Sequence, residues 1–439
     1  MGDVWIFKGY MQYFVMDGYL NRFKSNRLAL IAAVLFFVVN IVGCTPQATR
    51  PDSSGDMPQL PSEDEVKLIS ESERASAEIK RKGLLFNDSD LVSYVRQVGA
   101  RVAPNETGNL KLQFFVIRDP MVNAFAFPSG HIYVTIGLLA RLQNEAQLAF
   151  ILGHEVAHVV RQHSLEARQN RKIQVVAAHV VDLLLFGTSL AYLPFSASIS
   201  SYSRSQEDEA DEVGFAAAAK AGYEVTAVLQ TFDVMNETKD VNALRGSIFA
   251  DHPTNDSRQR NMRELVEDKE IVLKADAETG EDRYSQIKTG LTQKNIELKL
   301  RERQYELTID AADLALSHYP EDSALYYYRG EARRLMGADP KGAAREHSWL
   351  YGKSFDDELI SEFETKRSTN FADATEDFNK ALSLDPKFAL AHRGLGLIAH
   401  AQDNPGDAIT LLETYLATGN SIRDGRYIRS LLKGIQNDK

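Results

Sequence analysis

The sequence has 439 residues and a mass of 49.1 kDa, a length that predicts two or three domains. It is 44% hydrophobic and 25% charged, which argues against a largely disordered chain and against a multi-span membrane protein. Lysine and arginine number 50 against 61 aspartate and glutamate, a net charge of −11, so no nucleic acid is expected as a partner. The single cysteine excludes an intrachain disulfide and a zinc site built from cysteines.

The amino-terminal segment has the pattern of a secretory signal. A basic patch at 21–27 precedes an uncharged apolar run at 28–43, which is shorter than the roughly 20 residues of a membrane-spanning helix. The run ends in Ile-Val-Gly-Cys, which resembles the lipobox of bacterial lipoproteins, where the cysteine is acylated and becomes the first mature residue. We therefore expect residues 1–43 to be a lipoprotein signal peptide and Cys44 to carry the lipid. A plain signal anchor with an incidental cysteine is the alternative.

The residues after the cysteine predict a tether and a location. Residues 44–61 combine prolines with Ser, Gly and Asp, a composition that cannot bury enough apolar area to fold. Thr45, rather than an aspartate, follows the cysteine, and by resemblance to Gram-negative lipoproteins this favours the outer membrane. We expect a periplasmic, lipid-anchored protein at the outer membrane. Translation could start at Met1 or at Met16, and the second start would give a more usual signal peptide.

The first folded elements predict two helices and a small sheet. A capping-box pattern starts a charged helix at Ser62 that runs to Lys82, and a second helix is expected at 90–102. Aromatic and β-branched residues predict strands at 111–117 and 131–135, on either side of a Pro-Ser-Gly turn. We interpret 110–136 as a small antiparallel sheet.

A central helix is predicted from Asn144 to Ser164, with Asn144 as its cap and apolar residues at helical spacing. The apolar stretch 173–199 contains charged and helix-breaking residues, so a buried hairpin or a lid is expected there and not a membrane span. A further helix is predicted at 206–221, ended by Gly222.

The sharpest motif is His154-Glu155-Val156-Ala157-His158 on this central helix. Residues four apart on a helix lie on one face about 6 Å apart, so the imidazoles of His154 and His158 can converge on one ion. Glu155 is not needed as a ligand and can act as the general base that polarises water. Two incidental histidines on a helix are the alternative, but the predicted cap and the acidic candidates downstream favour one zinc ion per chain.

A catalytic zinc site needs a third protein ligand and an open fourth position. Glu207 and Asp211 lie four residues apart on a predicted helix, so Glu207 can reach the ion while Asp211 accepts a hydrogen bond from a ligand histidine. Spacing alone leaves Glu209 as a competitor, and a solvated acidic face is the alternative for the whole run.

The pairing of H-E-V-A-H with a later E-x-x-A-D helix resembles the gluzincin peptidases related to HtpX and the CaaX prenyl proteases. In that family the first Glu of E-x-x-A-D is the zinc ligand, which favours Glu207 over Glu209. The segment 123–131 is similar to the family's N-A-F-A-x-P-G-G-H, with Ser129 in place of a glycine. The resemblance spans about 62–265 and, with the repeats described below, points to the BepA-like periplasmic subfamily.

Two further elements are expected at the site. His252 opens a segment similar to the family's H-P-x-x-x-x-R, and we expect it to approach the zinc from a loop, as a resting ligand or as a donor to the oxyanion. A loop histidine stacked on Pro253 is the alternative. The strand at 122–127 can pair with an extended peptide, which makes Asn123, Ala124 and Phe125 candidate substrate-binding residues.

The carboxy-terminal part has the pattern of a tetratricopeptide array. Ala374, Phe378, Ala381 and Pro386 follow the spacing of that repeat, and small residues there let paired helices approach closely. Similar matches occur upstream, ending at Gly330. The interval from Gly330 to Ala374 is longer than one repeat, which predicts an insertion near 335–370. A generic helical bundle is the alternative.

These features predict an α+β, mainly helical fold: a zincin-like metallopeptidase domain at 62–275, with a small antiparallel sheet, and an all-α repeat domain at 284–439. The predicted function is a zinc endopeptidase that cleaves unfolded or misassembled envelope proteins. By resemblance, the repeats are expected to dock the outer-membrane protein assembly machinery. The alternatives are a chaperone or scaffold that acts through the repeats with a latent zinc site, and a structural lipoprotein with a zinc-stabilised core.

Overall fold

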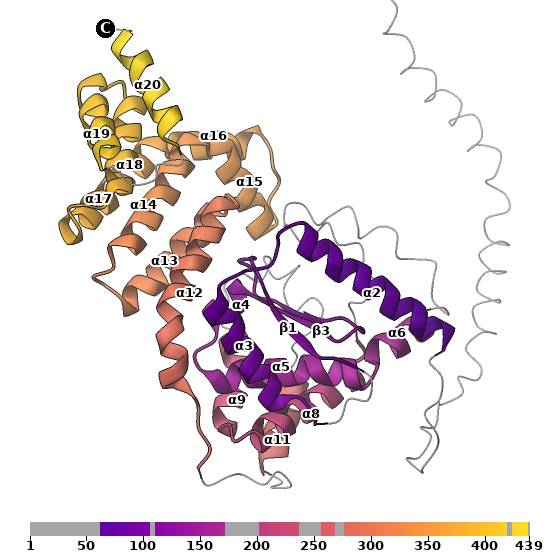
Figure 1. Ribbon diagram of the computed structural model, residues 1–439. Coiled ribbons are helices and arrows are strands. Elements are labelled where there is room, and N and C mark those ends of the chain that lie inside the picture. The colour runs from indigo at the N-terminus through magenta and orange to yellow at the C-terminus, as the bar shows by residue number, and fades with distance from the viewer. Residues whose placement is uncertain are drawn as a thin grey trace, which may run out of the picture. The chain divides into compact units, whose positions relative to one another are not determined.

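The computed structural model describes residues 62–105, 110–171, 202–236, 256–267, 276–418 and 424–437 (Figure 1). The predicted signal peptide and tether, Cys44, the apolar segment 173–199 and His252 lie outside the described residues. Within the described ranges, no helix has both the length and the apolar character that crossing a bilayer requires. The predicted fold class is confirmed, because helices predominate around one small sheet and the carboxy-terminal region is helical.

The first two helices of the described residues begin at side-chain caps. Helix α2 (Glu63–Arg81) starts at Ser62, whose hydroxyl accepts a hydrogen bond from the Glu65 amide, as the capping pattern predicts. Helix α3 (Ser89–Val102) starts at Asp88, whose carboxylate accepts hydrogen bonds from the backbone amides of Asp90 and Leu91. Helix α2 buries its apolar side against one face of the sheet, where Tyr133 donates a hydrogen bond to Ser76.

The sheet is mixed, which corrects the expectation that it is antiparallel. Strand β1 (Gln113–Ile117) pairs in parallel with β3 (His131–Thr135), and β2 (Ala124–Ala126) pairs antiparallel with the other side of β3. Strand β3 lies at the centre of the sheet and is the most buried of the three strands, and β2 lies at an edge. The tight β2–β3 turn passes through Gly130 at φ 87°, a conformation that favours glycine.

The central helix α5 (Glu145–Val160) is buried along almost its whole length. Asn144 caps it by accepting a hydrogen bond from the Gln147 amide at 3.1 Å, as predicted. The helix ends earlier than the predicted Ser164, because Gln162 takes a positive φ of 56° and starts a turn into α6 (His163–Arg171). The other helices around it are α4 (Ile136–Arg141), α8 (Arg204–Lys220), α9 (Val225–Asn236) and α11 (Asp256–Glu267).

The carboxy-terminal region consists of helices joined by short turns (Figure 1). Small residues at the repeat positions lie at helix contacts: Ala374 and Ala381 are fully buried, and Gly330 approaches Phe378 so closely that a Cβ atom there would lie 3.0 Å from its ring. The helices are α12 (Glu281–Arg301), α13 (Tyr305–His318), α14 (Ser323–Ala338), α15 (Pro340–Tyr351), α16 (Asp357–Thr365), α17 (Arg367–Leu384), α18 (Ala389–Ala401), α19 (Pro405–Ala417) and α20 (Gly425–Asn437).

Helices α15 and α16 occupy the stretch where the repeat register is longer than one unit. Helix α14 packs directly on α17 across this stretch, and Arg329 of α14 lies 2.5 Å from Asp377 of α17. The helix pair α15–α16 therefore interrupts the sequence of the array without separating the two helices that flank it.

Helix α12 is anchored to the helix that carries the H-E-V-A-H motif. Glu145, the first residue of α5, is buried and lies 2.7 Å from the Arg283 guanidinium of α12. Tyr284 of α12 also donates a 2.5 Å hydrogen bond to the Leu139 carbonyl of α4. The repeat helices are thus linked, through one helix, to the start of the motif helix.

Candidate metal centre

The site depends on a close contact between helices α5 and α8. Gly153 and Gly214 face each other across this contact: a Cβ atom on Gly214 would lie 2.7 Å from the His154 amide nitrogen, and one on Gly153 would lie 3.1 Å from the Gly214 Cα. Only glycines allow the two backbones to approach so closely. The contact lies one residue from His154 and one helical turn from Asp211, so it brings the side chains of both helices together.

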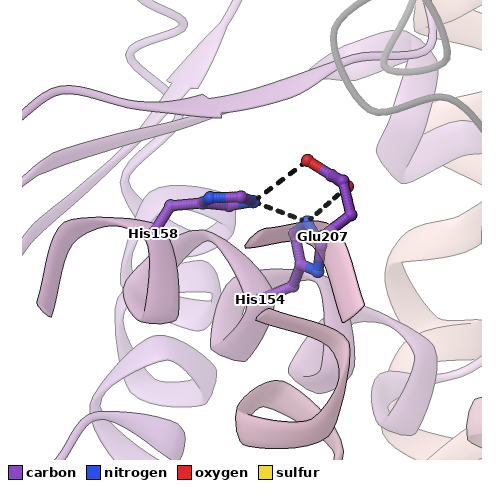
Figure 2. A group of neighbouring side chains, drawn as sticks. All are labelled: His154, His158 and Glu207. Atoms are coloured by element: carbon purple, nitrogen blue, oxygen red, sulfur yellow. Dashed lines mark hydrogen bonds and ion pairs between the residues drawn. The ribbon is translucent and has the colours of Figure 1, made fainter. Parts of the chain in front are cut away.

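His154, His158 and Glu207 form one buried cluster (Figure 2). The Nε2 atoms of the two histidines are 3.0 Å apart. The Glu207 carboxylate lies 3.6 Å from His154 Nε2 and 3.5 Å from His158 Nε2. Both imidazoles rise from α5, as the i, i+4 spacing predicts, and the carboxylate faces them from α8.

The donor set and its spacing fit a zinc ion. Tetrahedral zinc with ligands at 2.0–2.1 Å places its donor atoms roughly 3.3 Å apart. The three separations of 3.0, 3.5 and 3.6 Å bracket that value. Two imidazoles and one carboxylate also leave a fourth position for water or substrate, as in catalytic zinc sites. The cluster can therefore hold one metal ion per chain.

The structure separates the two acidic candidates on α8. Glu207 joins the histidine cluster, whereas Glu209 turns toward His163 at 3.4 Å and Arg161 at 3.2 Å. Spacing alone left both open, and the resemblance to the gluzincins selected Glu207. The position of Glu207 in the structure agrees with that selection.

Asp211 lies behind the first histidine, as predicted. Its Oδ1 is 2.9 Å from His154 Nδ1, the ring nitrogen that faces away from the cluster. Arg258 of α11 donates two hydrogen bonds of 2.7 Å to Asp211 and also lies 2.9 Å from Glu207. Burial by itself raises the pKa of Asp211, but the bonds from Arg258 and His154 outweigh it and hold the pKa below its usual value.

The second histidine also has neighbours on its outer side, and these were not predicted. His158 Nδ1 lies 2.9 Å from His163 Nδ1, and the His158 ring stacks on Tyr202 with centroids 3.8 Å apart. Burial lowers the pKa of His163. Arg258 is the last residue of the H-P-x-x-x-x-R segment, but its contacts with Asp211 and Glu207 were not predicted.

The remaining candidates are placed on neighbouring elements. Glu155 is buried on α5, between the two histidines in the sequence. Asn123 and Ala124 are buried at the start of edge strand β2, which packs against α5, and Phe125 is half-buried and stacks on Tyr133. The structure thus places an edge strand beside the motif helix, the arrangement that peptide binding by strand pairing requires.

Two histidines on one helix, a carboxylate from a second helix and an adjoining edge strand are the arrangement of a zincin-type metal site. Residues 91–266 match Peptidase family M48. This confirms the resemblance to the BepA-like gluzincins.

Several relatives match this region. The chain is 33% identical over 193 residues to a putative beta-barrel assembly-enhancing protease of Vibrio cholerae serotype O1, covering 41% of this chain and 40% of that protein. It is 24% identical over 192 residues to the beta-barrel assembly-enhancing protease of Escherichia coli K12, covering 41% and 39%. It is 30% identical over 183 residues to the mitochondrial metalloendopeptidase OMA1 of Schizosaccharomyces pombe, covering 40% and 54%. The chain therefore spans about two fifths to one half of the length of these relatives.

Proposed function

We propose that this protein is a zinc-dependent endopeptidase of the bacterial cell envelope that cleaves unfolded or misassembled proteins. The observation that carries the proposal is the buried cluster of His154, His158 and Glu207, whose spacing fits zinc. The match to Peptidase family M48 and the relatives named as proteases support the same activity.

In the proposed reaction each residue has one task. A zinc ion held by His154, His158 and Glu207 would supply an acidified water and polarise the scissile carbonyl. Glu155 accepts the proton of the attacking water and passes it to the leaving amine. Asp211 holds the ring of His154 in place, and Arg258 pairs with both α8 carboxylates.

The edge strand β2 would hold the substrate. We propose that an extended peptide adds along Asn123, Ala124 and Phe125 on the side of β2 away from β3, because among the described strands β2 pairs with β3 alone. The amide and carbonyl of Asn123 bond Thr135 on the β3 side, so Ala124 would supply the outward main-chain groups. This mode accepts many sequences, provided that the substrate is locally unfolded. It therefore suits an enzyme that removes misassembled proteins.

The location and partners in this proposal follow from the sequence and from the relatives' names. A lipid on Cys44 would hold the enzyme in the periplasm at the outer membrane. The names of the bacterial relatives state a role in beta-barrel assembly, so we propose that the repeat helices dock the outer-membrane protein assembly machinery or its clients. His252 is proposed to approach the zinc from the segment before α11.

The substitution Glu155→Gln tests the proposal. The variant should fold and retain zinc, but its rate of casein cleavage should fall at least ~100-fold, because the general base is removed while the three metal ligands remain. Zinc content by elemental analysis and casein cleavage are measured on both proteins, with Glu212→Gln, an exposed position of α8, as the matched control. A wild-type protein without zinc, or a Glu155→Gln variant with full cleavage, would contradict the proposal. If Glu155→Gln abolishes cleavage but still restores function in cells, the chaperone role gains.

A further inference from the structure

His163 is a buried histidine that has no role in the reaction described above. It is 1% exposed and begins α6, directly after the turn that ends α5. Its ring lies edge-on to the His158 ring, with centroids 4.9 Å apart. It therefore contacts a candidate metal ligand from the side opposite the cluster.

The hydrogen bond between the two rings joins atoms of the same kind. The Nδ1 atoms of His158 and His163 are 2.9 Å apart, so in neutral rings one of them donates and the other accepts. If His163 were the donor, the neutral His158 ring would carry its proton on Nε2, and that atom could not bind a metal. If His163 is the acceptor, His158 carries its proton on Nδ1 and leaves the Nε2 lone pair toward the cluster.

The contact with Glu209 determines which ring nitrogen of His163 carries the proton. Its Oε2 lies 3.4 Å from His163 Nε2, and its Oε1 lies 3.2 Å from the Arg161 guanidinium. The Glu209 carboxylate, which pairs with Arg161, offers acceptor oxygens to the His163 ring. His163 therefore carries its proton on Nε2, and its Nδ1 is an acceptor.

We propose that His163, held by Glu209, is a positioning residue that fixes the tautomer of His158 so that Nε2 is free to bind the metal. This inference rests on the proposed zinc site. The two ligand histidines are then oriented by different partners: Asp211 with Arg258 behind His154, and His163 with Glu209 behind His158. Tyr202 adds a second restraint, because it stacks on the His158 ring and its hydroxyl lies 3.0 Å from the Ser164 hydroxyl.

The test compares His163→Leu with His163→Asn in the full chain. Leucine removes both ring nitrogens, whereas asparagine keeps an acceptor oxygen near the position of Nδ1. We expect His163→Leu to weaken zinc binding about 10- to 100-fold and His163→Asn to weaken it much less, measured by competition with a chelator. Nitrogen NMR of labelled histidine side chains in the metal-free protein should show His158 protonated on Nδ1 in the wild type and a mixture of tautomers in His163→Leu.

Control variants separate positioning from a loss of structure. Glu209→Ala should weaken zinc binding in the same direction as His163→Leu, and Glu212→Ala, exposed on the same helix, should leave it unchanged. Wild-type zinc affinity and an unchanged His158 tautomer in His163→Leu would overturn the inference while leaving the proposed function intact. Equal losses in His163→Leu and His163→Asn without a tautomer change would also overturn it. A wild-type protein that binds no zinc would instead overturn the proposed function.

Discussion

At the scale of single residues, Arg258 is the cation that makes two buried carboxylates compatible. Its guanidinium binds Asp211 through two hydrogen bonds and lies 2.9 Å from Glu207, and it is itself only 5% exposed. Two carboxylates on one helical turn repel each other when buried, so the arginine lowers the cost of bringing them together. The motif helix α5 alone therefore does not make the site, which also needs α11.

The substitution Arg258→Met should destabilise the metal-free protein locally. Methionine fills much of the volume but leaves Asp211 and Glu207 without this cation, and breaking such a buried pair costs about 3–5 kcal/mol. Amide hydrogen exchange of α8 and α11 peptides measures the loss. Arg260→Met, at an exposed position of α11, is the matched control and should change the same peptides by less than about 0.5 kcal/mol. Equal exchange in both variants would show that Arg258 is not the stabilising cation.

At the scale of elements, the distance between α5 and α8 is set by the Gly153–Gly214 contact. The ligands come from both helices, so the position of one helix relative to the other sets the separation of Glu207 from the histidines. Because the obstacle to a side chain at Gly214 is backbone and not a flexible side chain, a substitution there moves a whole helix.

The substitution Gly214→Ala should therefore reduce both stability and metal affinity. The new methyl group would start 2.7 Å from the His154 nitrogen, and relieving such overpacking costs about 1–3 kcal/mol. Chelator competition and hydrogen exchange of α5 measure the two effects. Gly290→Ala on α12 has nothing within 4 Å of the added carbon and should be neutral or stabilising by up to ~1 kcal/mol. Tight zinc binding in Gly214→Ala would show that the helices can separate without opening the site.

At the scale of the whole molecule, Glu145 connects the motif helix to the helix that precedes the repeats. Its carboxylate accepts hydrogen bonds from Tyr94, Tyr223, Arg101 and Arg283, which come from three different parts of the chain. Burial alone raises the pKa of Glu145, but the bonds from Arg283 and the two tyrosines outweigh it and lower the pKa. The ionised carboxylate is thus the form that holds these parts together.

This lowered pKa predicts a dependence of stability on pH. Because the folded-state pKa lies below the unfolded value near 4.5, the stabilisation is fully present above that pH and is lost as the pH falls below it. The urea midpoint, followed by circular dichroism between about pH 6 and pH 3, should fall. Glu145→Gln should have a lower midpoint at neutral pH and a flatter dependence below about pH 4.5. An unchanged slope in Glu145→Gln would assign the dependence to other carboxylates.

The parts of this molecule that were predictable from sequence are those fixed by neighbours along the chain. The cap at Asn144 and the i, i+4 pair of His154 and His158 involve residues within one or two turns of a helix, and both were predicted. The order of the strands was not predicted, because strand pairing joins segments that lie apart in the sequence and no local pattern specifies the neighbour of each strand.

The same division holds within the site. Glu207 was selected over Glu209 by resemblance, since both are acidic residues in the same predicted helix. Nothing near Arg258 or His163 in the sequence signals which residues they contact, because those contacts join different helices. The polar groups that orient the candidate ligands therefore required the tertiary structure.

The glycine contact between α5 and α8 also bears on when hydrolysis can begin. During synthesis His154 and His158 leave the ribosome well before Glu207. A nascent chain whose helices α5 and α8 have not yet packed together therefore has an incomplete set of metal ligands. The same holds for any copy of the enzyme that loses its tertiary structure later. Under the proposed function, a misfolded copy therefore loses the metal site and with it the capacity to hydrolyse peptides, and its unfolded chain becomes a possible substrate for intact copies.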